Sequence, residues 1–251
     1  MVINELPIGS IVRLGRYALG HRPDDMIDID WIKVSKNNDF ISQKVLLGIQ
    51  YDAREGWSGN YDYSLSNIRQ FMNSENHSWY HPTHPNDHGP DYVMLDNYVT
   101  IHTGRYSGFL SHFQDDEISI LEPINDDYMR LPTVSEIMGG FQYFKRYGKR
   151  AHPVEEFGCL SLNNYRDGMY HRYYMIDNMS PTTPNLAEMG RDGSYSSISP
   201  VRYSGLRPVC KIKASATVIE TGKNTYKMNI SSTGPIKFFK ETQSLDWLLG
   251  L

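Results

Sequence analysis

The sequence predicts a mixed α+β fold in which strands outnumber short helices. Two runs, 11–17 and 27–34, carry apolar residues at alternate positions, which is typical of half-buried strands. The segment 65–73 instead places its apolar residues at helical spacing. Thr133 and Glu136 have the spacing of a capping box, which predicts the start of another helix. Alternation and helical periodicity in one chain indicate the α+β class.

The remaining elements follow from turn residues and apolar runs. The turn-rich stretch 20–25 predicts a hairpin between the first two strands, and 44–49 predicts a third, more buried strand. Asp28 and Asp30 share one face of their strand, which we interpret as the solvated face. Ser64 is the expected cap of the first helix. Further predicted segments are the hairpin strands 92–95 and 98–101, a short helix from 109 to 113, a strand at 159–162 and a loop at 180–192.

The stretch from Gly205 to Lys213 is the segment on which the predicted sheet depends most. Gly205-Leu206-Arg207-Pro208 is followed by an alternating run, and proline suits the first residue of a strand because it cannot donate to the ladder. Pro208 therefore predicts a strand start, with Cys210 buried just after it. We expect residues 205–213 to share a sheet with the first third of the chain.

Composition excludes several classes of protein. The 251 residues carry a net charge of −4 and 22% charged residues, so no broad positive field is available for nucleic acid. Cys159 and Cys210 lack zinc or disulfide spacing and predict buried thiols in a reducing cytoplasm. The sequence has neither an apolar run of about 20 residues nor a secretory signal, which predicts no membrane partner and release, if any, by a route such as lysis.

A histidine-rich segment spans residues 77–91. The potential ligands of zinc or a related ion are His77, His81, His84, Asp87, His88 and Asp91. The prolines of this segment favour a stiff polar loop, and no fixed-spacing motif is present. We therefore predict no metal and no cofactor, and no catalytic residues.

Tyrosine is unusually frequent, with 18 copies. Tyrosine suits both binding surfaces, where it offers an apolar face and a hydroxyl, and strands, where it fits the pleat. Two interpretations therefore stay open. The binding interpretation places a ligand site on the predicted strand 169–176 and the turn before it, at Tyr165, Tyr170, His171, Tyr173 and Tyr174.

Six motifs in one order resemble a family of uncharacterised bacterial and bacteriophage domains. The resemblance spans about residues 9 to 213 and depends on the collinear order of the motifs. They are Gly9-Ser10-Ile11-Val12-Arg13-Leu14-Gly15-Arg16-Tyr17, Trp31-Ile32-Lys33-Val34, Ser66-Asn67-Ile68-Arg69-Gln70-Phe71-Met72-Asn73, Phe109-Leu110-Ser111-His112-Phe113, Leu131-Pro132-Thr133-Val134-Ser135-Glu136 and Gly205-Leu206-Arg207-Pro208-Val209.

This family looks like a relative of the C-type lectin-like fold shared with formylglycine-generating enzymes. The resemblance implies a twisted, mostly antiparallel sheet with two or three short helices and long irregular loops. Residues 76–106 are an insertion between the family's two helices, and its Trp-Leu-Arg-Ser stretch is absent near Cys159. The paired active cysteines of the sulfatase-modifying enzymes have no counterpart here, so their oxidative catalysis is not implied.

Residues 214–251 lie beyond the resemblance, which divides the chain into a domain at 1–213 and a C-terminal appendage. Strands at 217–221 and 226–230 predict a hairpin that turns at Gly222-Lys223-Asn224. The chain then closes with an apolar cluster that needs either its own core or a partner's groove. The candidate docking residues are Leu245, Trp247, Leu248, Leu249 and Leu251.

These observations favour a non-catalytic binding or assembly protein, a structural component of a bacteriophage virion such as a capsid decoration or tail-associated protein. It would be made in the host cytoplasm and reside in the virion. Its expected partners are other virion or assembly proteins, a cell-surface glycan and a second copy of itself. Two alternatives stay open: a metal-dependent hydrolase that uses the histidine-rich insertion, and a soluble carbohydrate-binding protein.

Overall fold

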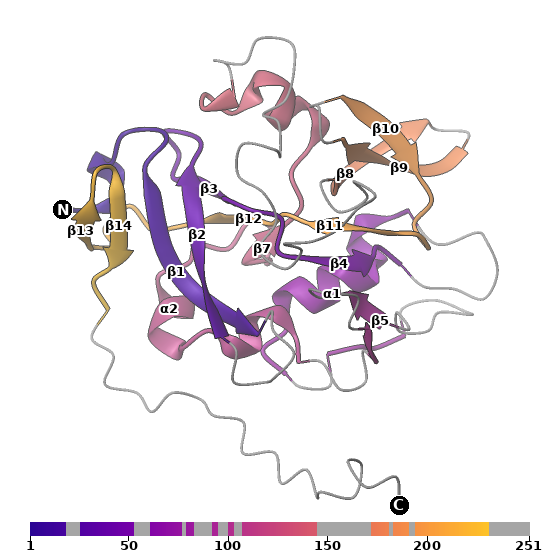
Figure 1. Ribbon diagram of the computed structural model, residues 1–251, viewed down its shortest axis with the longest axis horizontal. Helices are drawn as coiled ribbons and strands as arrows, with labels where there is room; N and C mark the ends of the chain where they lie inside the picture. The colour runs from indigo at the N-terminus through magenta and orange to yellow at the C-terminus, as the bar shows by residue number, and fades with distance from the viewer. Residues whose placement is uncertain are drawn as a thin grey trace, which may run out of the picture.

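The structure is a computed structural model, shown in Figure 1. It describes residues 1–18, 26–52, 61–76, 79–82, 92–94, 100–102, 107–144, 172–180, 183–190 and 194–230. Within these ranges the chain forms two seven-stranded sheets and several short helices. Neighbouring strands are mostly antiparallel, so the predicted α+β class is confirmed.

The first sheet gathers strands from both ends of the described chain. Its order is β13 (Val218–Gly222), β14 (Thr225–Met228), β1 (Ile11–Ala18), β2 (Met26–Lys33), β3 (Asp39–Ser42), β12 (Val209–Lys211) and β7 (Met129–Arg130). The predicted pairing of the first two strands is confirmed, because β1 and β2 are antiparallel with Val12 opposite Trp31. Asp28 and Asp30 form ion pairs with Arg13 and Arg16 on the partly solvated face, as expected.

The second sheet has the order β10 (Tyr195–Ile198), β9 (Thr183–Met189), β8 (Tyr173–Ser180), β11 (Tyr203–Leu206), β4 (Leu47–Gln50), β5 (Tyr92–Met94) and β6 (Thr100–His102). The antiparallel pair β5 and β6 confirms the predicted hairpin strands. The prediction of a loop over residues 180–192 is wrong, since β9 pairs with β8 on one side and β10 on the other. Pro184 obscured this strand in the sequence, because a proline usually argues against a strand interior, and it lies at the second residue of β9.

Two chain segments cross from one sheet to the other side by side, and we call this region the crossing. β3 leads into β4, and β11 returns into β12, so that β3 pairs with β12 and β4 with β11. In Figure 1 β11 and β12 run almost end to end through the middle of the molecule. The expectation that residues 205–213 join strands of the first third is therefore confirmed, as is the strand start after Pro208.

The buried side chain of Arg207 links the two chain segments of the crossing by hydrogen bonds. Its side chain is 1% exposed. Nε donates to the Ser42 carbonyl at 3.0 Å and Nη2 donates to the Gln43 carbonyl at 3.3 Å. Gly205 permits the close approach of β8, because a Cβ atom there would lie 2.3 Å from the Arg172 carbonyl oxygen. Arg207 and Gly205 thus hold three chain segments together where the sheets meet.

Short helices pack against the sheets. They are η1 (Ile3–Glu5), η2 (Tyr63–Leu65), α1 (Asn67–Asn73), η5 (Phe109–His112), α2 (Asp115–Ser119) and the π-helical turn η6 (Glu136–Gly140). The predicted Ser64 cap is wrong: Ser66 caps α1 by accepting the Arg69 N–H, and Ser64 instead donates its N–H to Asp62. The capping box is confirmed, because Thr133 N–H donates to Glu136 Oε2 at 2.8 Å and Glu136 N–H to Thr133 Oγ1 at 3.1 Å.

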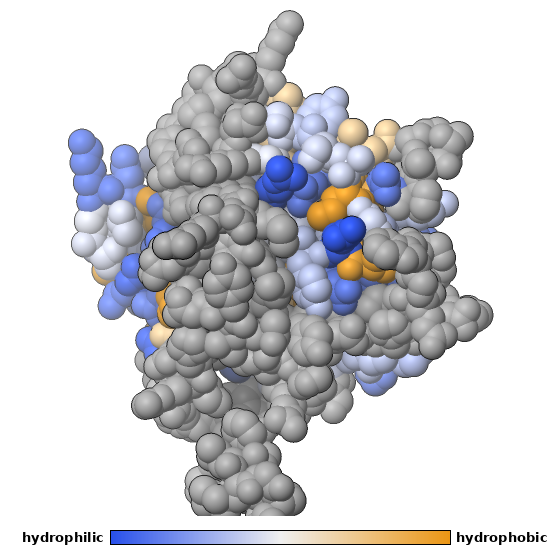
Figure 2. Space-filling model, turned by 45° about the vertical axis from the view of Figure 1, so that its right-hand side comes forward, coloured by the Kyte–Doolittle hydropathy of each residue, from blue (hydrophilic) through white to orange (hydrophobic). Residues whose placement is uncertain are grey.

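The core forms two clusters, and β8 contributes to both. Tyr174 belongs to one cluster with Leu206, whereas Tyr173 and Met175 belong to the other with Val209. This alternation is the one expected of a strand with both faces covered. On the face seen in Figure 2, apolar residues among the described atoms lie in small groups between hydrophilic ones.

The C-terminal hairpin is part of the first sheet. β13 and β14 are antiparallel, which confirms the predicted hairpin, and Asn224 occupies the left-handed region in its turn with φ 56°. β14 also pairs with β1 in parallel, and Tyr226 packs in the larger core cluster. Residues 231–251, with the apolar cluster predicted to dock, lie outside the described residues.

Candidate functional site

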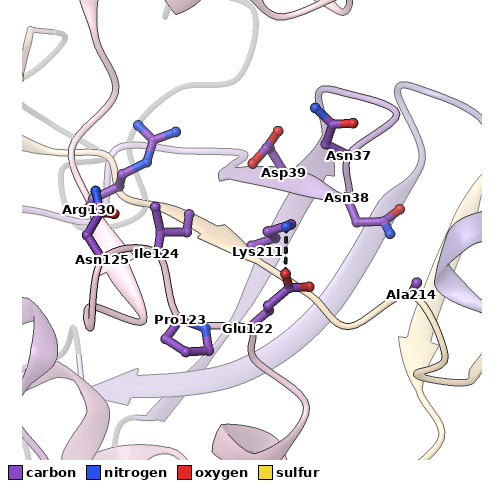
Figure 3. Close-up of a pocket in the computed structure, with 10 residues that line it drawn as sticks. All are labelled: Asn37, Asn38, Asp39, Glu122, Pro123, Ile124, Asn125, Arg130, Lys211 and Ala214. Carbon is purple, nitrogen blue, oxygen red and sulfur yellow. Dashed lines mark hydrogen bonds and ion pairs between the residues drawn. The ribbon is translucent and has the colours of Figure 1, made fainter.

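A polar pocket of about 550 Å³ opens beside β12, and its lining includes residues of the turn before β3 and of the turn before β7. Figure 3 shows Asn37 and Asp39 across the pocket from Pro123 and Glu122, with Lys211 between them. The residues that line it are Asn37, Asn38, Asp39, Glu122, Pro123, Ile124, Asn125, Arg130, Lys211 and Ala214.

The two turns adopt backbone conformations that few residue types accept. Asn38 has φ 60°, Asn125 φ 51° and Asp126 φ 71°, all in the left-handed region that asparagine and aspartate tolerate better than other non-glycine residues. Non-glycine residues held in this region often cluster at functional sites. Their gathering around one pocket is the first reason to regard it as a site.

Other contacts fix both turns in place. In the first, the Ser35 hydroxyl oxygen accepts the N–H of Asn37 at 3.0 Å and of Asp39 at 3.3 Å. In the second, the N–H of Ile124 donates to the Asp127 carbonyl at 2.7 Å. The side chain of Asp127 accepts Arg69 Nε at 2.7 Å, which ties this turn to α1. The pocket rim is therefore held independently of any ligand.

Each cation of the pocket already has a carboxylate partner. Lys211 Nζ lies 2.6 Å from Glu122 Oε1. Arg130 forms a two-pronged pair with Glu136, with Nη2–Oε1 at 2.6 Å and Nη1–Oε2 at 2.8 Å. Burial alone would lower the pKa of Arg130, but the bonds to Glu136 raise it above its ordinary value. Arg130 is thus a fixed positive charge that is locally neutralised.

The side-chain amides of the pocket, in contrast, have no hydrogen-bond partner among the residues that the structure describes. Within the part of the chain that the structure describes, the side-chain amides of Asn37, Asn38 and Asn125 make no hydrogen bond. Asn38 is only 5% exposed, and its Oδ1 is buried without a donor. One oxygen of Asp39 accepts the Ser35 hydroxyl and the other accepts nothing among the described residues. A buried polar group without a partner costs about 1–3 kcal/mol, so a ligand that supplies the partner gains from this cost.

The pocket could not be predicted from the sequence, because its residues come from five separate stretches of the chain. The available signal was local: Asn37-Asn38 and Asn125-Asp126 are dipeptides typical of turns that need left-handed residues. That signal predicts turns but not that two of them meet at β12.

The five residues that the sequence predicts to bind a ligand fall in two groups. Tyr165, Tyr170 and His171 lie outside the described residues. Tyr173 and Tyr174 are 0% exposed. Burial raises the pKa of both hydroxyls, and Tyr174 donates to the Arg202 carbonyl. Arg207 lies 5.2 Å from the ring centroid of Tyr173. Both rings therefore pack in the hydrophobic core and have no exposed face that could contact a ligand.

Most of the histidine-rich segment also lies outside the described residues, which include only 79–82 of it. The backbone N–H of His81 donates to Gln70 Oε1 at 2.8 Å. In the described ranges no group of three or more His, Cys, Asp or Glu side chains is placed to hold a metal ion. Cys210 is buried, as predicted, and burial raises the pKa of its thiol well above the ordinary value.

None of the helices in the described ranges is both long enough and apolar enough to span a bilayer. Comparisons with protein-family models, with curated proteins and with solved structures found no match to this chain.

Proposed function

We propose that this chain is a non-catalytic binding and assembly protein, a structural component of a bacteriophage virion. The observation that carries the binding role is the pocket beside β12, whose lining includes three asparagine amides that have no hydrogen-bond partner among the described residues. Amides recognise a ligand through hydrogen bonds and are poor nucleophiles, acids and bases. Such a site is suited to recognition.

The virion assignment is supported by the resemblance of the six motifs to bacterial and bacteriophage domains. The crossing supports the further proposal of a C-type lectin-like domain, since strands from the two ends of the matched region lie side by side there. Two short helices, α1 and η5, contribute buried residues to the larger core cluster and follow each other in the order that the resemblance implies. The partners expected under this proposal are other virion or assembly proteins.

Particle association tests the assembly role. Tagged full-length protein is produced in a host during phage growth, and particles are purified by density gradient and examined by mass spectrometry. We expect the protein to sediment with the particles in a fixed ratio to the capsid protein. Its confinement to the unsedimented fraction would refute a virion role.

The apolar segment Leu245–Leu251 is the proposed dock. Deleting it should abolish particle association while the domain stays folded by circular dichroism. Ile219→Ser is the matched control, because Ile219 is an apolar residue that is 45% exposed elsewhere on the molecule. Association that survives the deletion, or that is lost equally in the control, would contradict the role of this segment.

The metal-dependent hydrolase is the rival from another class, and it depends on the histidine-rich insertion alone. Elemental analysis of the purified protein and of the double variant His81→Ala/His84→Ala separates the two. Stoichiometric zinc, nickel or iron that disappears in the variant would favour the enzyme, whereas traces in both would remove its basis.

A further inference from the structure

We propose that the pocket beside β12 binds a neutral sugar unit, held by the side chains of Asn37, Asn38, Asp39 and Asn125. This inference rests on the proposed binding function and names the ligand class of its site. It does not use the tyrosines Tyr173 and Tyr174, which are buried.

The charges of the pocket favour an uncharged ligand. Its lining holds two cations, Arg130 and Lys211, and two anions, Asp39 and Glu122, so their formal charges sum to zero. Glu136, which is not part of the lining, pairs with Arg130 and brings the formal charge of the pocket together with this pair to −1, which adds to the repulsion of an anion. A phosphate would face Asp39 and Glu122, and a divalent cation would face Arg130 and Lys211. Each ion therefore meets repulsion that a neutral polar molecule avoids.

The free groups of the pocket match the hydroxyls of a sugar. Each asparagine amide offers a carbonyl acceptor and two N–H donors, and each sugar hydroxyl both donates and accepts. Asp39 adds an acceptor oxygen that has no donor in the described chain. The left-handed backbone at Asn38 and Asn125 fixes the direction in which their side chains leave the chain. The loss of conformational entropy when these residues bind a ligand is therefore small.

The size and the apolar part of the lining agree with this ligand. A cavity of about 550 Å³ lies in the range of small-molecule sites. Pro123 and Ile124 provide a small apolar wall, suited to the C–H face of a sugar ring. A peptide partner would instead need a desolvated apolar pocket for an anchor side chain, whereas this lining is mostly polar and its apolar members are Pro123, Ile124 and Ala214.

The test combines three substitutions that remove the amides without changing the backbone. Glycine retains the left-handed conformation, so Asn38→Gly and Asn125→Gly delete the side chains alone, and Asn37→Ala completes the set. Asn224→Gly is the matched control, because Asn224 has φ 56° in the exposed turn between β13 and β14. Full-length protein is titrated with the methyl glycosides of glucose, galactose, mannose and N-acetylglucosamine and followed by saturation-transfer NMR.

We expect at least one glycoside to bind the wild type and Asn224→Gly with equal affinity, and to bind the triple variant about tenfold or more weakly. Inorganic phosphate and Ca²⁺ should not compete. Failure of all four glycosides to bind, or undiminished binding by the triple variant, would overturn the proposal. Binding of a displayed peptide library without any glycoside would also overturn it and assign the pocket to a protein partner. Particle association of the same triple variant is measured separately, so the loss of sugar binding and the loss of assembly are distinguishable.

Discussion

Arg207 and Lys211 lie four residues apart on the same stretch of chain and have opposite surroundings. Arg207 is 1% exposed at the crossing and donates to two backbone carbonyls, and the salt bridges of the described residues include none to it. Lys211 stands at the pocket with 29% of its side chain exposed and pairs with Glu122. At the crossing a cation donates to backbone carbonyls of another segment. At the pocket each cation pairs with a carboxylate, and the asparagine amides have no hydrogen-bond partner among the described residues. Arg207 thus contributes to the stability of the crossing, and the amides of the pocket are the groups that we propose for recognition.

The largest expected effect is on the crossing. Arg207→Met removes the donors to the Ser42 and Gln43 carbonyls, and hydrogen bonds from charged groups contribute about 1.5–3 kcal/mol each, so the free energy of unfolding should fall by about 3 kcal/mol or more. Arg207→Lys should recover part of this loss, because it keeps the charge but not the two-pronged geometry. Urea unfolding followed by tryptophan fluorescence measures both variants.

If the crossing and the pocket are separate regions, Arg207→Met should leave ligand binding at the pocket unchanged. Below its unfolding transition, Arg207→Met should bind the glycoside as the wild type does. A variant of normal stability, or one that is folded but no longer binds, would mean that the two regions are not separate.

A smaller loss is expected at Gly205. A Cβ atom there would lie 2.3 Å from the Arg172 carbonyl oxygen and 2.5 Å from Val45 Cγ1, so Gly205→Ala should cost about 1–3 kcal/mol by overpacking. Gly222→Ala is the matched control in the first sheet, where the nearest atom, Thr225 Cβ, is 3.9 Å away. Thermal unfolding compares the two, and an equal shift in Tm for both would show that the close approach at the crossing is unimportant.

The crossing was predictable from sequence, and the pocket was not. Gly205-Leu206-Arg207-Pro208 before an alternating run carries its own signal, since glycine, proline and alternation each constrain the local backbone. β3 was missed because Asp39–Ser42 is four residues long and shows little alternation. The buried tyrosines Tyr173 and Tyr174 were correctly placed on a strand, but no local pattern reveals that both faces of that strand are covered. The pocket depends on which turns meet in space, and Asn38 and Asn125 are far apart in sequence.

The smallest expected effect is on the pH dependence of stability, and it arises at Glu117, which does not line the pocket. Burial raises the pKa of Glu117 above its ordinary value of 4.5, although the N–H groups of Gln114 and Gly15 lower it in part. The folded state therefore holds this proton more tightly than the unfolded chain, and its contribution to stability is lost as pH rises from about 4.5 through the folded-state pKa. Glu117→Gln should flatten this part of the curve of urea midpoint against pH. An unchanged slope would assign it to other carboxylates.

Side-chain amide spectra test the central claim most directly, namely that the asparagines without partners recognise the ligand. With ¹⁵N-asparagine labelling, titration of the bound glycoside should shift the side-chain NH₂ signals of Asn37, Asn38 and Asn125. Those of Asn67, which is buried, and of Asn73, which donates to the Arg69 and Met129 carbonyls, should stay in place. Shifts confined to Asn67 and Asn73, or absent from the three pocket residues at saturating sugar, would contradict the account.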